Sequence, residues 1–177
     1  MRRLIAYVLV LLAPSVAHAA LDIGDRAPDF TAPAALGGRV YKFSLADALR
    51  KGPVVLYFFP AAFSEGCSIE AHEFAEATPG FSELGASVIG VSADDIGTLT
   101  RFSVQACQSR FPVASDEQQS VIKSFDAVMK TRPEYANRIT YVIAPDGAVV
   151  YTYQGLNPTR HVEKVMGALK AWAAQHK

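Results

Sequence analysis

Two apolar runs that show no alternation constrain the fold of this chain most strongly. Residues 53–59 read Pro-Val-Val-Leu-Tyr-Phe-Phe, and residues 87–91 read Ser-Val-Ile-Gly-Val. Such runs, without alternating polar and apolar residues, are typical of strands that are buried on both faces. The residues between them favour a helix. A strand, a helix and a second strand in this order predict a crossover between two parallel neighbours.

Helices are expected on either side of this unit as well as within it. The linking helix is predicted from Cys67 to about Leu84, with Ile69, Phe74 and Ala75 facing inward. Further helices are predicted within the segments Ser44–Arg50 (capped by Ser44), Ser92–Gln108, Gln118–Phe125 and Pro158–Gln175. The last of these is amphipathic and carries Val162, Val165, Met166, Leu169 and Trp172 on its apolar face.

The remaining segments predict antiparallel strands and turns. Ile139–Ala144 and Ala148–Tyr153 flank Pro145-Asp146-Gly147, a strong turn signal that indicates a hairpin. Phe111–Val113 is short and extended, and Ala20–Val40 is an extended segment with turns at Gly24-Asp25 and Gly37-Gly38. We therefore predict an α/β protein with a thioredoxin-like fold, in which helices flank both faces of a mixed central β-sheet.

The first residues predict export. Arg2 and Arg3 precede an apolar run over Leu4–Ala13, and Ala17-His18-Ala19 places small residues where a signal peptidase reads. The run is ten residues long, whereas a membrane-spanning helix needs about twenty. This length favours a cleaved signal peptide over an uncleaved anchor. We therefore expect residues 1–19 to be a signal peptide and residues 20–177 to form one domain. The mature protein is expected in the periplasm, without stable membrane association.

Charge and composition narrow the classes of partner. The chain has 17 basic and 17 acidic residues, and removing Arg2 and Arg3 leaves 15 basic against 17 acidic. No run of Lys and Arg is present, so we expect no nucleic-acid partner and a small substrate. The two cysteines and four histidines form no zinc-ligand pattern, so neither a metal nor a cofactor is expected. Redox chemistry or a single structural disulfide remain as roles for the cysteines.

Cys67 lies where the first buried strand has passed through a loop into a helix. At this kind of junction α/β proteins place their chemistry. Unpaired backbone N–H groups and the helix dipole favour a thiolate there. They can hold a cysteine pKa well below its usual value of about 8.5. The alternative is an unreactive cysteine buried among apolar side chains.

Residues 60–67 read Pro-Ala-Ala-Phe-Ser-Glu-Gly-Cys, and Cys67 continues into Ser-Ile-Glu. The first pattern resembles the signature of the peroxiredoxins (the alkyl hydroperoxide reductase/thiol-specific antioxidant superfamily): Pro, three residues, Thr or Ser, two residues, Cys. The continuation resembles the bacterioferritin-comigratory (Q-type) branch. Three more segments are similar to the family: residues 24–30, residues 111–116 and residues 138–147, the last in the place of the arginine-bearing segment.

The resemblance implies a thiol-dependent peroxidase that reduces hydrogen peroxide or organic hydroperoxides through a sulfenic acid at Cys67. Ser64 would offer its hydroxyl to the peroxide, and Gly66 and Cys67 their backbone N–H groups. Arg138 would hold the thiolate charge and position the peroxide, and Pro60 would restrict water near the sulfur. Without the motif, Pro60 would simply end a strand, Ser64 would be a loop or cap residue, and Arg138 would be solvated.

The sequence departs from the family pattern at two positions. Ser64 replaces the commoner Thr, so the methyl group that restricts the rotamer is missing. Many Q-type members carry a second cysteine five positions after the first, where this chain has His72, which we expect on the helix surface. Cys107, expected in the helix after the second buried strand, is the remaining candidate for the resolving cysteine, with a buried structural thiol as the alternative.

The resemblance also implies a dithiol reductant of the thioredoxin type and, from the Q-type branch, a monomer. Glu70 is expected to have a structural role, because the helix dipole favours an acidic residue in the first turn. Three rival interpretations stay open on the same fold. A disulfide reductase would need Cys-x-x-Cys, but residues 64–67 read Ser-Glu-Gly-Cys. A binding module such as a copper carrier would need two close cysteines and a histidine, and a scaffold with one structural disulfide would need neither.

Overall fold

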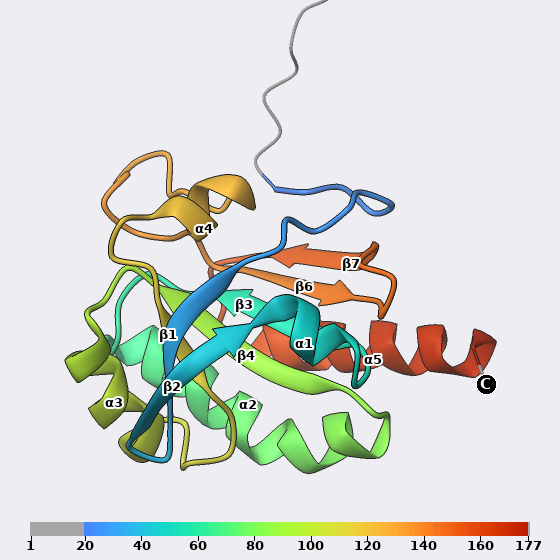
Figure 1. Cartoon of the computed structure of the whole chain (residues 1–177), viewed down its shortest axis with the longest axis horizontal. Coiled ribbons are helices and arrows are strands. Elements are labelled where there is room, and N and C mark those ends of the chain that lie inside the picture. Colours follow the sequence, from blue (N-terminus) through green and yellow to red (C-terminus); the bar gives the residue numbers. More distant parts are fainter. Residues whose placement is uncertain (1–19, 177) are drawn as a thin grey trace, which may run out of the picture.

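The computed structural model describes residues 20–176 (Figure 1), so the predicted signal peptide over residues 1–19 lies outside the described residues. The strands are β1 (Thr31–Leu36), β2 (Arg39–Ser44), β3 (Val54–Phe58), β4 (Ser87–Ser92), β5 (Val113–Ser115), β6 (Ile139–Ile143) and β7 (Val149–Gln154). The helices are α1 (Leu45–Leu49), α2 (Glu65–Glu83), α3 (Ile96–Gln105), α4 (Ser120–Ser124) and α5 (Thr159–Gln175).

The strands form a mixed sheet with the order β2-β1-β5-β4-β3-β6-β7. The strand β4 runs parallel to both β3 and β5, as expected for strands joined by helical crossovers. The remaining pairs, β1 with β2, β1 with β5, β3 with β6 and β6 with β7, are antiparallel. This arrangement confirms the predicted mixed sheet, the parallel pair of buried strands and the hairpin around Pro145-Asp146-Gly147.

The sheet is buried on both faces because β3 sends alternate side chains into two apolar clusters. Val54, Leu56 and Phe58 face a cluster that includes residues of α1 and α4. Val55 and Tyr57 face the other cluster, which includes residues of α2, α3 and α5. Figure 1 shows these three helices together on one side of the sheet. Because both faces are covered, β3 needs no polar residue, and this explains the absence of alternation in its sequence.

Two local predictions differ from the structure. The helix α2 begins at Glu65, two residues before the predicted start. Ile69 was predicted to face inward, but this prediction was wrong, since its side chain is 39% exposed. Phe74 and Ala75 are buried as predicted. Ile69 precedes Phe74 by five positions, which places it on another face of a helix with 3.6 residues per turn.

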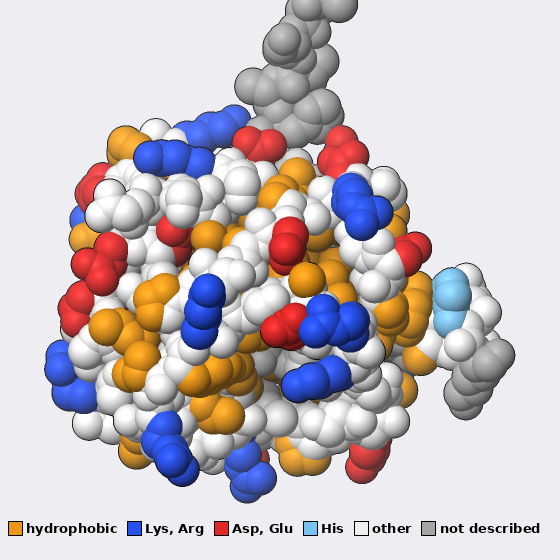
Figure 2. Space-filling model, viewed as in Figure 1, with side chains coloured by type: hydrophobic (Ala, Val, Ile, Leu, Met, Phe, Trp, Pro, Cys, Tyr) orange, Lys and Arg blue, Asp and Glu red, His pale blue; other side chains and the backbone are white. Residues whose placement is uncertain are grey.

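The N-terminal extended segment contains more structure than predicted. Residues 31–44 form an antiparallel pair, β1 with β2, around the predicted turn at Gly37-Gly38. Both glycines have positive φ, at 56° and 78°, which explains the choice of residue. On the face seen in Figure 2, Lys and Arg side chains are interspersed with Asp and Glu, with hydrophobic side chains between them. Among residues 20–176, no helix combines the length and apolar character needed to cross a membrane.

Candidate active site

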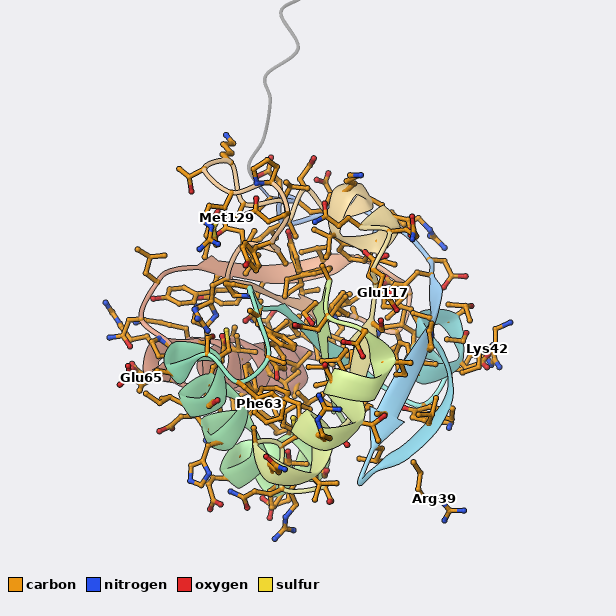
Figure 3. All side chains as sticks on the ribbon, turned by 90° about the vertical axis from the view of Figure 1, so that its left-hand side faces the viewer. Arg39, Lys42, Phe63, Glu65, Glu117 and Met129 are labelled. Carbon is orange, nitrogen blue, oxygen red and sulfur yellow. The ribbon has the colours of Figure 1, made fainter. Side chains whose placement is uncertain are left out.

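Cys67 lies in the first turn of α2, and its side chain is only 1% exposed. The loop that leads to it is held by a hydrogen bond from the Ala62 amide to the Asp94 carboxylate, at 2.8 Å. Phe63 adopts a φ of 65°, a region that bulky residues rarely enter. Its ring meets the Phe102 ring of α3 edge-on, with 5.2 Å between centroids. Figure 3 shows Phe63 between α2 and α3, with Glu65 at the start of α2.

The structure places Arg138 directly beside Cys67. Its Nη2 donates to Cys67 Sγ at 3.5 Å, and its Nη1 lies 3.5 Å from the Gly66 carbonyl oxygen. The Arg138 amide donates to Asn137 Oδ1 at 2.9 Å, while the Asn137 amide donates to the Ala127 carbonyl at 2.6 Å. The backbone before β6 is therefore fixed, and the guanidinium reaches the sulfur across the end of the sheet.

Gly66 provides the space that this contact needs. A Cβ atom at position 66 would lie 3.2 Å from Arg138 Nη2, which is closer than nine in ten real Cβ contacts. A side chain at this position would therefore push the guanidinium away from the sulfur or force the first turn of α2 to move. Gly66 was expected to offer its backbone N–H group to the peroxide, and the contact with Arg138 gives a separate reason for a residue without a side chain at this position.

Glu70 lies in the second turn of α2, since that helix begins at Glu65, and it contacts Arg138 of the site. Its side chain is fully buried, and its Oε2 accepts a hydrogen bond from Arg138 Nη1. Burial raises the pKa of Glu70 to about 8, even though the charge and hydrogen bond of Arg138 act in the opposite direction. Its Oε1 is buried without a hydrogen-bond partner in the described part of the chain.

Sequence reasoning missed His161 and Thr140, which lie behind Glu70. His161, on α5, is fully buried, and its Nδ1 is 2.8 Å from Thr140 Oγ1 and 3.6 Å from Glu70 Oε1. Burial lowers the pKa of His161 to about 4. Helical spacing could have found it, because His161, Val165 and Leu169 follow one another at intervals of four and are all buried.

These two pKa shifts predict how stability depends on pH. Above pH 6.5, where an unfolded histidine loses its proton, His161 becomes neutral in both states, whereas Glu70 stays largely protonated in the folded protein until about pH 8 and is ionised in the unfolded chain. The folded state thus binds the extra proton, and the free energy of unfolding should fall as pH rises, by about 1 kcal/mol between pH 6.5 and 8. Below pH 6.5 the lowered pKa of His161 acts in the opposite direction, because the unfolded chain then takes up a proton.

Urea titrations of reduced protein at pH 6.5 and 8 would measure this effect. The variant Glu70→Gln should lose it, because an amide does not titrate in this range. Glu73→Gln, on the same helix and partly exposed, is the matched control and should retain the wild-type difference. If the free energy of unfolding changes between pH 6.5 and 8 by the same amount in the wild-type protein and the Glu70→Gln variant, the prediction is contradicted.

Ser64 and Pro60 lie in the loop before α2. Ser64 is exposed and occupies the N-cap position of α2, but its hydroxyl donates to the Ala61 carbonyl at 2.9 Å instead of capping the helix. Its oxygen therefore retains lone pairs that can accept a hydrogen bond. Pro60 follows Phe59 at the bend and is partly buried. It has no N–H group, so it leaves no unsatisfied donor beside the site.

Cys107 lies just beyond α3, whereas the sequence placed it within that helix. The helix ends at Gln105, and the residues after Cys107 turn sharply: Gln108 and Ser109 have φ values of 51° and 58°. Cys107 is fully buried, and burial raises its pKa far above the ordinary value. Both cysteines are free and belong to the same apolar cluster. His72 is exposed as predicted, and its Nδ1 lies 2.7 Å from Gln108 Nε2.

Within residues 20–176, no group of three or more His, Cys, Asp and Glu side chains is arranged to hold a metal ion. The reactive features of the site are a buried sulfur, a guanidinium beside it and helix amides around it. Such a site can stabilise a thiolate and the negative charge that develops when the sulfur attacks a small electrophile.

Comparison with known proteins places the chain in a family. Residues 23–152 match the AhpC/TSA family. Peroxiredoxin Bcp of Xanthomonas campestris pv. campestris is 30% identical over 128 residues, which cover 69% of this chain and 79% of that protein. The crystal structure of peroxidoxin BcpB from Mycobacterium tuberculosis matches with a TM-score of 0.76 at 30% identity, covering 84% of this chain and 96% of that one.

A structure of peroxiredoxin Q from Xanthomonas campestris matches with a TM-score of 0.69 at 29% identity, covering 80% of this chain and 90% of that one. These similar structures confirm the thioredoxin-like fold. The matched proteins include Bcp and Q-type peroxiredoxins, the branch that the motif around Cys67 resembles. The chain therefore belongs to the AhpC/TSA family of peroxiredoxins.

Proposed function

We propose that Cys67 is the peroxide-reducing nucleophile of this chain, which is by family a thiol-dependent peroxidase and therefore an oxidoreductase. One observation carries the assignment to Cys67: its sulfur is buried in the first turn of α2 with Arg138 Nη2 at 3.5 Å. A cation that donates to a buried sulfur favours the thiolate, which is the reactive form.

In the proposed reaction, the Cys67 thiolate attacks the terminal oxygen of a peroxide. The S–O bond forms as the O–O bond breaks, so the sulfur is oxidised and the peroxide is reduced by the same electron pair. Cys67 becomes a sulfenic acid, and the leaving oxygen takes up a proton and departs as water or an alcohol.

Donors around the sulfur would stabilise the charge that spreads over both oxygens in the transition state. The first amide bonded within the helix turn is that of Ser68, which donates to the Ser64 carbonyl at 2.9 Å. The amides of Gly66 and Cys67 precede it and are therefore free of i−4 partners. Arg138 adds charge, and the Ser64 oxygen, whose hydrogen goes to Ala61, would accept the peroxide hydrogen.

Mass mapping of both cysteines tests this assignment. Reduced protein is treated with one equivalent of hydrogen peroxide in the presence of a sulfenic-acid trap, and each cysteine peptide is then weighed. We expect the trap adduct on Cys67 or a disulfide that includes Cys67. An adduct on Cys107 with an unmodified Cys67 would refute the assignment.

We further propose that Cys107 resolves the sulfenic acid by forming an intramolecular disulfide with Cys67 and releasing water. Both thiols lie in one apolar cluster, but both are buried. A disulfide requires Cα atoms within about 7 Å, so the first turn of α2 or the turn after α3 would have to open. The turn after Cys107 is suited to this, because its two residues with positive φ store strain.

The variant Cys107→Ser should therefore complete one turnover and then stall. With a dithiol reductant in excess, we expect a burst of about one equivalent of peroxide consumed, followed by a steady rate at least about tenfold below that of the wild type. Stopped-flow measurement of peroxide consumption provides both quantities. Ser109→Ala, an exposed neighbour in the same turn, is the control and should cycle normally. Normal cycling of Cys107→Ser would show that an external thiol resolves Cys67 directly.

We also propose that the enzyme acts after export. The basic residues, apolar run and small residues within residues 1–19 support a signal peptide and a periplasmic location. The electrons would come from a thioredoxin-like or other dithiol reductant, and the protein would work as a monomer, as the resemblance of the motif around Cys67 to the Q-type branch implies. N-terminal sequencing of protein from the periplasmic fraction, and sedimentation of that protein, would test these points. A full-length cytoplasmic product or a stable oligomer would refute them.

A further inference from the structure

We propose that His161 positions Glu70 and shares one buried proton with it, and that this proton balances the charge of the Cys67 thiolate. His161 would act through Glu70 and Arg138 and would not touch the peroxide, so it is a positioning residue. The inference rests on the proposed role of Cys67 and extends it to a residue of α5, far from the motif around that cysteine.

The hydrogen bonds of His161 define where its ring carries hydrogen. Its Nε2 lies 2.9 Å from the Gly155 carbonyl oxygen, which can only accept. Nε2 must therefore carry the hydrogen, and in the neutral ring Nδ1 is an acceptor. The Thr140 hydroxyl, 2.8 Å from Nδ1, can supply the donated hydrogen. In this tautomer Nδ1 carries no hydrogen, so His161 has none to donate to Glu70.

Glu70 places a second acceptor beside this nitrogen, just beyond hydrogen-bond distance. Its Oε1 lies 3.6 Å from His161 Nδ1, and neither side chain is accessible to solvent. Oε1 has no hydrogen-bond partner among the described residues. If Glu70 were ionised, its Oε1 would have no hydrogen-bond donor from His161. A buried charge without such a donor is unfavourable. One proton between the two groups removes the conflict, whether it resides on Oε1 or on Nδ1.

The charges of the cluster favour the same proton. Arg138 contributes one positive charge, while a Cys67 thiolate and an ionised Glu70 would contribute two negative ones. The buried cluster would then carry a net negative charge, which is unfavourable away from water. With one proton shared by Glu70 and His161, the charges of Arg138 and the thiolate cancel.

Among residues 20–176, the other ionisable groups that face the pair do not alter this count at neutral pH. From α2 the pair faces Cys67, from the start of β6 it faces Arg138, and from β7 it faces Tyr153, whose ring meets His161 edge-on at 4.7 Å. Tyr57 approaches from β3, and burial raises its pKa well above the ordinary value, so it is neutral. The shared proton therefore belongs to Glu70 and His161 alone.

Loss of the shared proton should weaken the reaction at Cys67. Ionised Glu70 would draw on the positive charge of Arg138, leaving less for the thiolate and for the developing oxygen charge. The rate of Cys67 with hydrogen peroxide should thus fall at high pH, near the pKa of about 8 of Glu70, and this fall is the alkaline limb of the pH profile. Iodoacetamide alkylation, which needs no peroxide activity, reports the titration of the same cluster.

Two substitutions separate this mechanism from a structural role of the pair. In a Cys107→Ser background with one thiol, Glu70→Gln should remove the alkaline limb. Its oxygen can still accept from Arg138, and its amide hydrogen replaces the shared proton toward His161 Nδ1. His161→Gln should move the limb to lower pH by about one unit, because a side-chain N–H in place of Nδ1 stabilises ionised Glu70. At a pH midway between the alkaline limbs of the variant and the background protein, the rate would fall about threefold, and the difference would approach tenfold above both limbs.

The matched control is His176→Gln, a histidine that follows the last turn of the same helix, is exposed and stacks on Trp172. Its pH profile should coincide with that of the Cys107→Ser background. Near-ultraviolet circular dichroism would establish that each variant is folded. If folded His161→Gln has the same alkaline limb as the control, the inference is overturned.

Nitrogen NMR of His161 in the reduced wild-type protein tests the shared proton without a substitution. We expect a hydrogen on Nε2 at all pH values and an Nδ1 signal that titrates together with the alkaline limb of Cys67 alkylation. An Nδ1 signal that does not change across this limb would overturn the inference. A protein that shows the expected Nδ1 titration but consumes no peroxide would refute the proposed function and leave the shared proton established.

Discussion

Replacing Cys67 with serine is expected to lower the rate of peroxide consumption by at least about a thousandfold. A serine hydroxyl stays protonated at neutral pH, whereas the reaction requires an anionic sulfur that peroxide can oxidise to a sulfenic acid. Arg138 would then have a neutral hydroxyl to donate to, and the amides at the start of α2 would have no thiolate to stabilise. Peroxide consumption with excess dithiol measures the loss.

The fold should survive this change, so the loss can be assigned to chemistry. Serine is close to cysteine in size, and its oxygen can accept the hydrogen bond from Arg138 Nη2 that the sulfur accepts in the native site. Thermal unfolding should therefore be cooperative in Cys67→Ser. A variant that is folded and consumes peroxide at the wild-type rate would remove Cys67 from the mechanism and return the disulfide-reductase and binding-module readings to consideration.

The elements that sequence predicted correctly are those set by local patterns. The strands β3 and β4 read as apolar runs because both of their faces are buried, and Pro145-Asp146-Gly147 signals a hairpin through turn chemistry. The pairing of β1 with β5 depends on a strand about eighty residues away. No local pattern encodes such a contact, so residues 20–40 appeared only as an extended segment with turns.

Glu70 and His161 show why the site was only partly predictable. Glu70 was predicted only to favour the helix dipole, whereas its burial in the second turn of α2 depends on Arg138, 68 residues along the chain. His161 is buried because Thr140 and the Gly155 carbonyl satisfy both of its ring nitrogens. Burying either side chain alone would cost free energy. The partners that the fold brings together offset this cost.

The position of Cys107 relative to α3 was mispredicted for a different reason: the helix was expected to include Cys107, but it ends at Gln105. Residues of good helix propensity continue past the end of α3, but the chain leaves the helix with positive φ at Gln108 and Ser109. Neither residue is a glycine, so the sequence contains none of the usual signals for a helix end. Contacts of this turn, such as the one from Gln108 to His72 of α2, compensate for its unfavourable conformation.

Replacing Arg138 is expected to have the second largest effect, a loss of about a hundredfold to a thousandfold in the rate of Cys67 with peroxide. Arg138→Met keeps the length of the side chain but removes the charge and the donor to the sulfur. Arg138→Lys keeps the charge but cannot reach Cys67, Gly66 and Glu70 at once, so we expect an intermediate loss. Stopped-flow rates of reduced protein with hydrogen peroxide would rank the variants.

Stability must be separated from catalysis in this test, because Arg138→Met leaves the buried Glu70 carboxyl without its hydrogen-bond donor, at a cost of about 1–3 kcal/mol. The double variant Arg138→Met with Glu70→Gln removes both partners of that hydrogen bond and the ionisable carboxyl, and it should remain folded but slow toward peroxide. Arg132→Met, in the same loop and exposed, is the control and should react normally. If the double variant is stable and reacts at the wild-type rate, the guanidinium is a structural partner of Glu70 alone. A stable but slow double variant shows that Arg138 acts on the sulfur and the peroxide, as the 3.5 Å contact with Cys67 indicates.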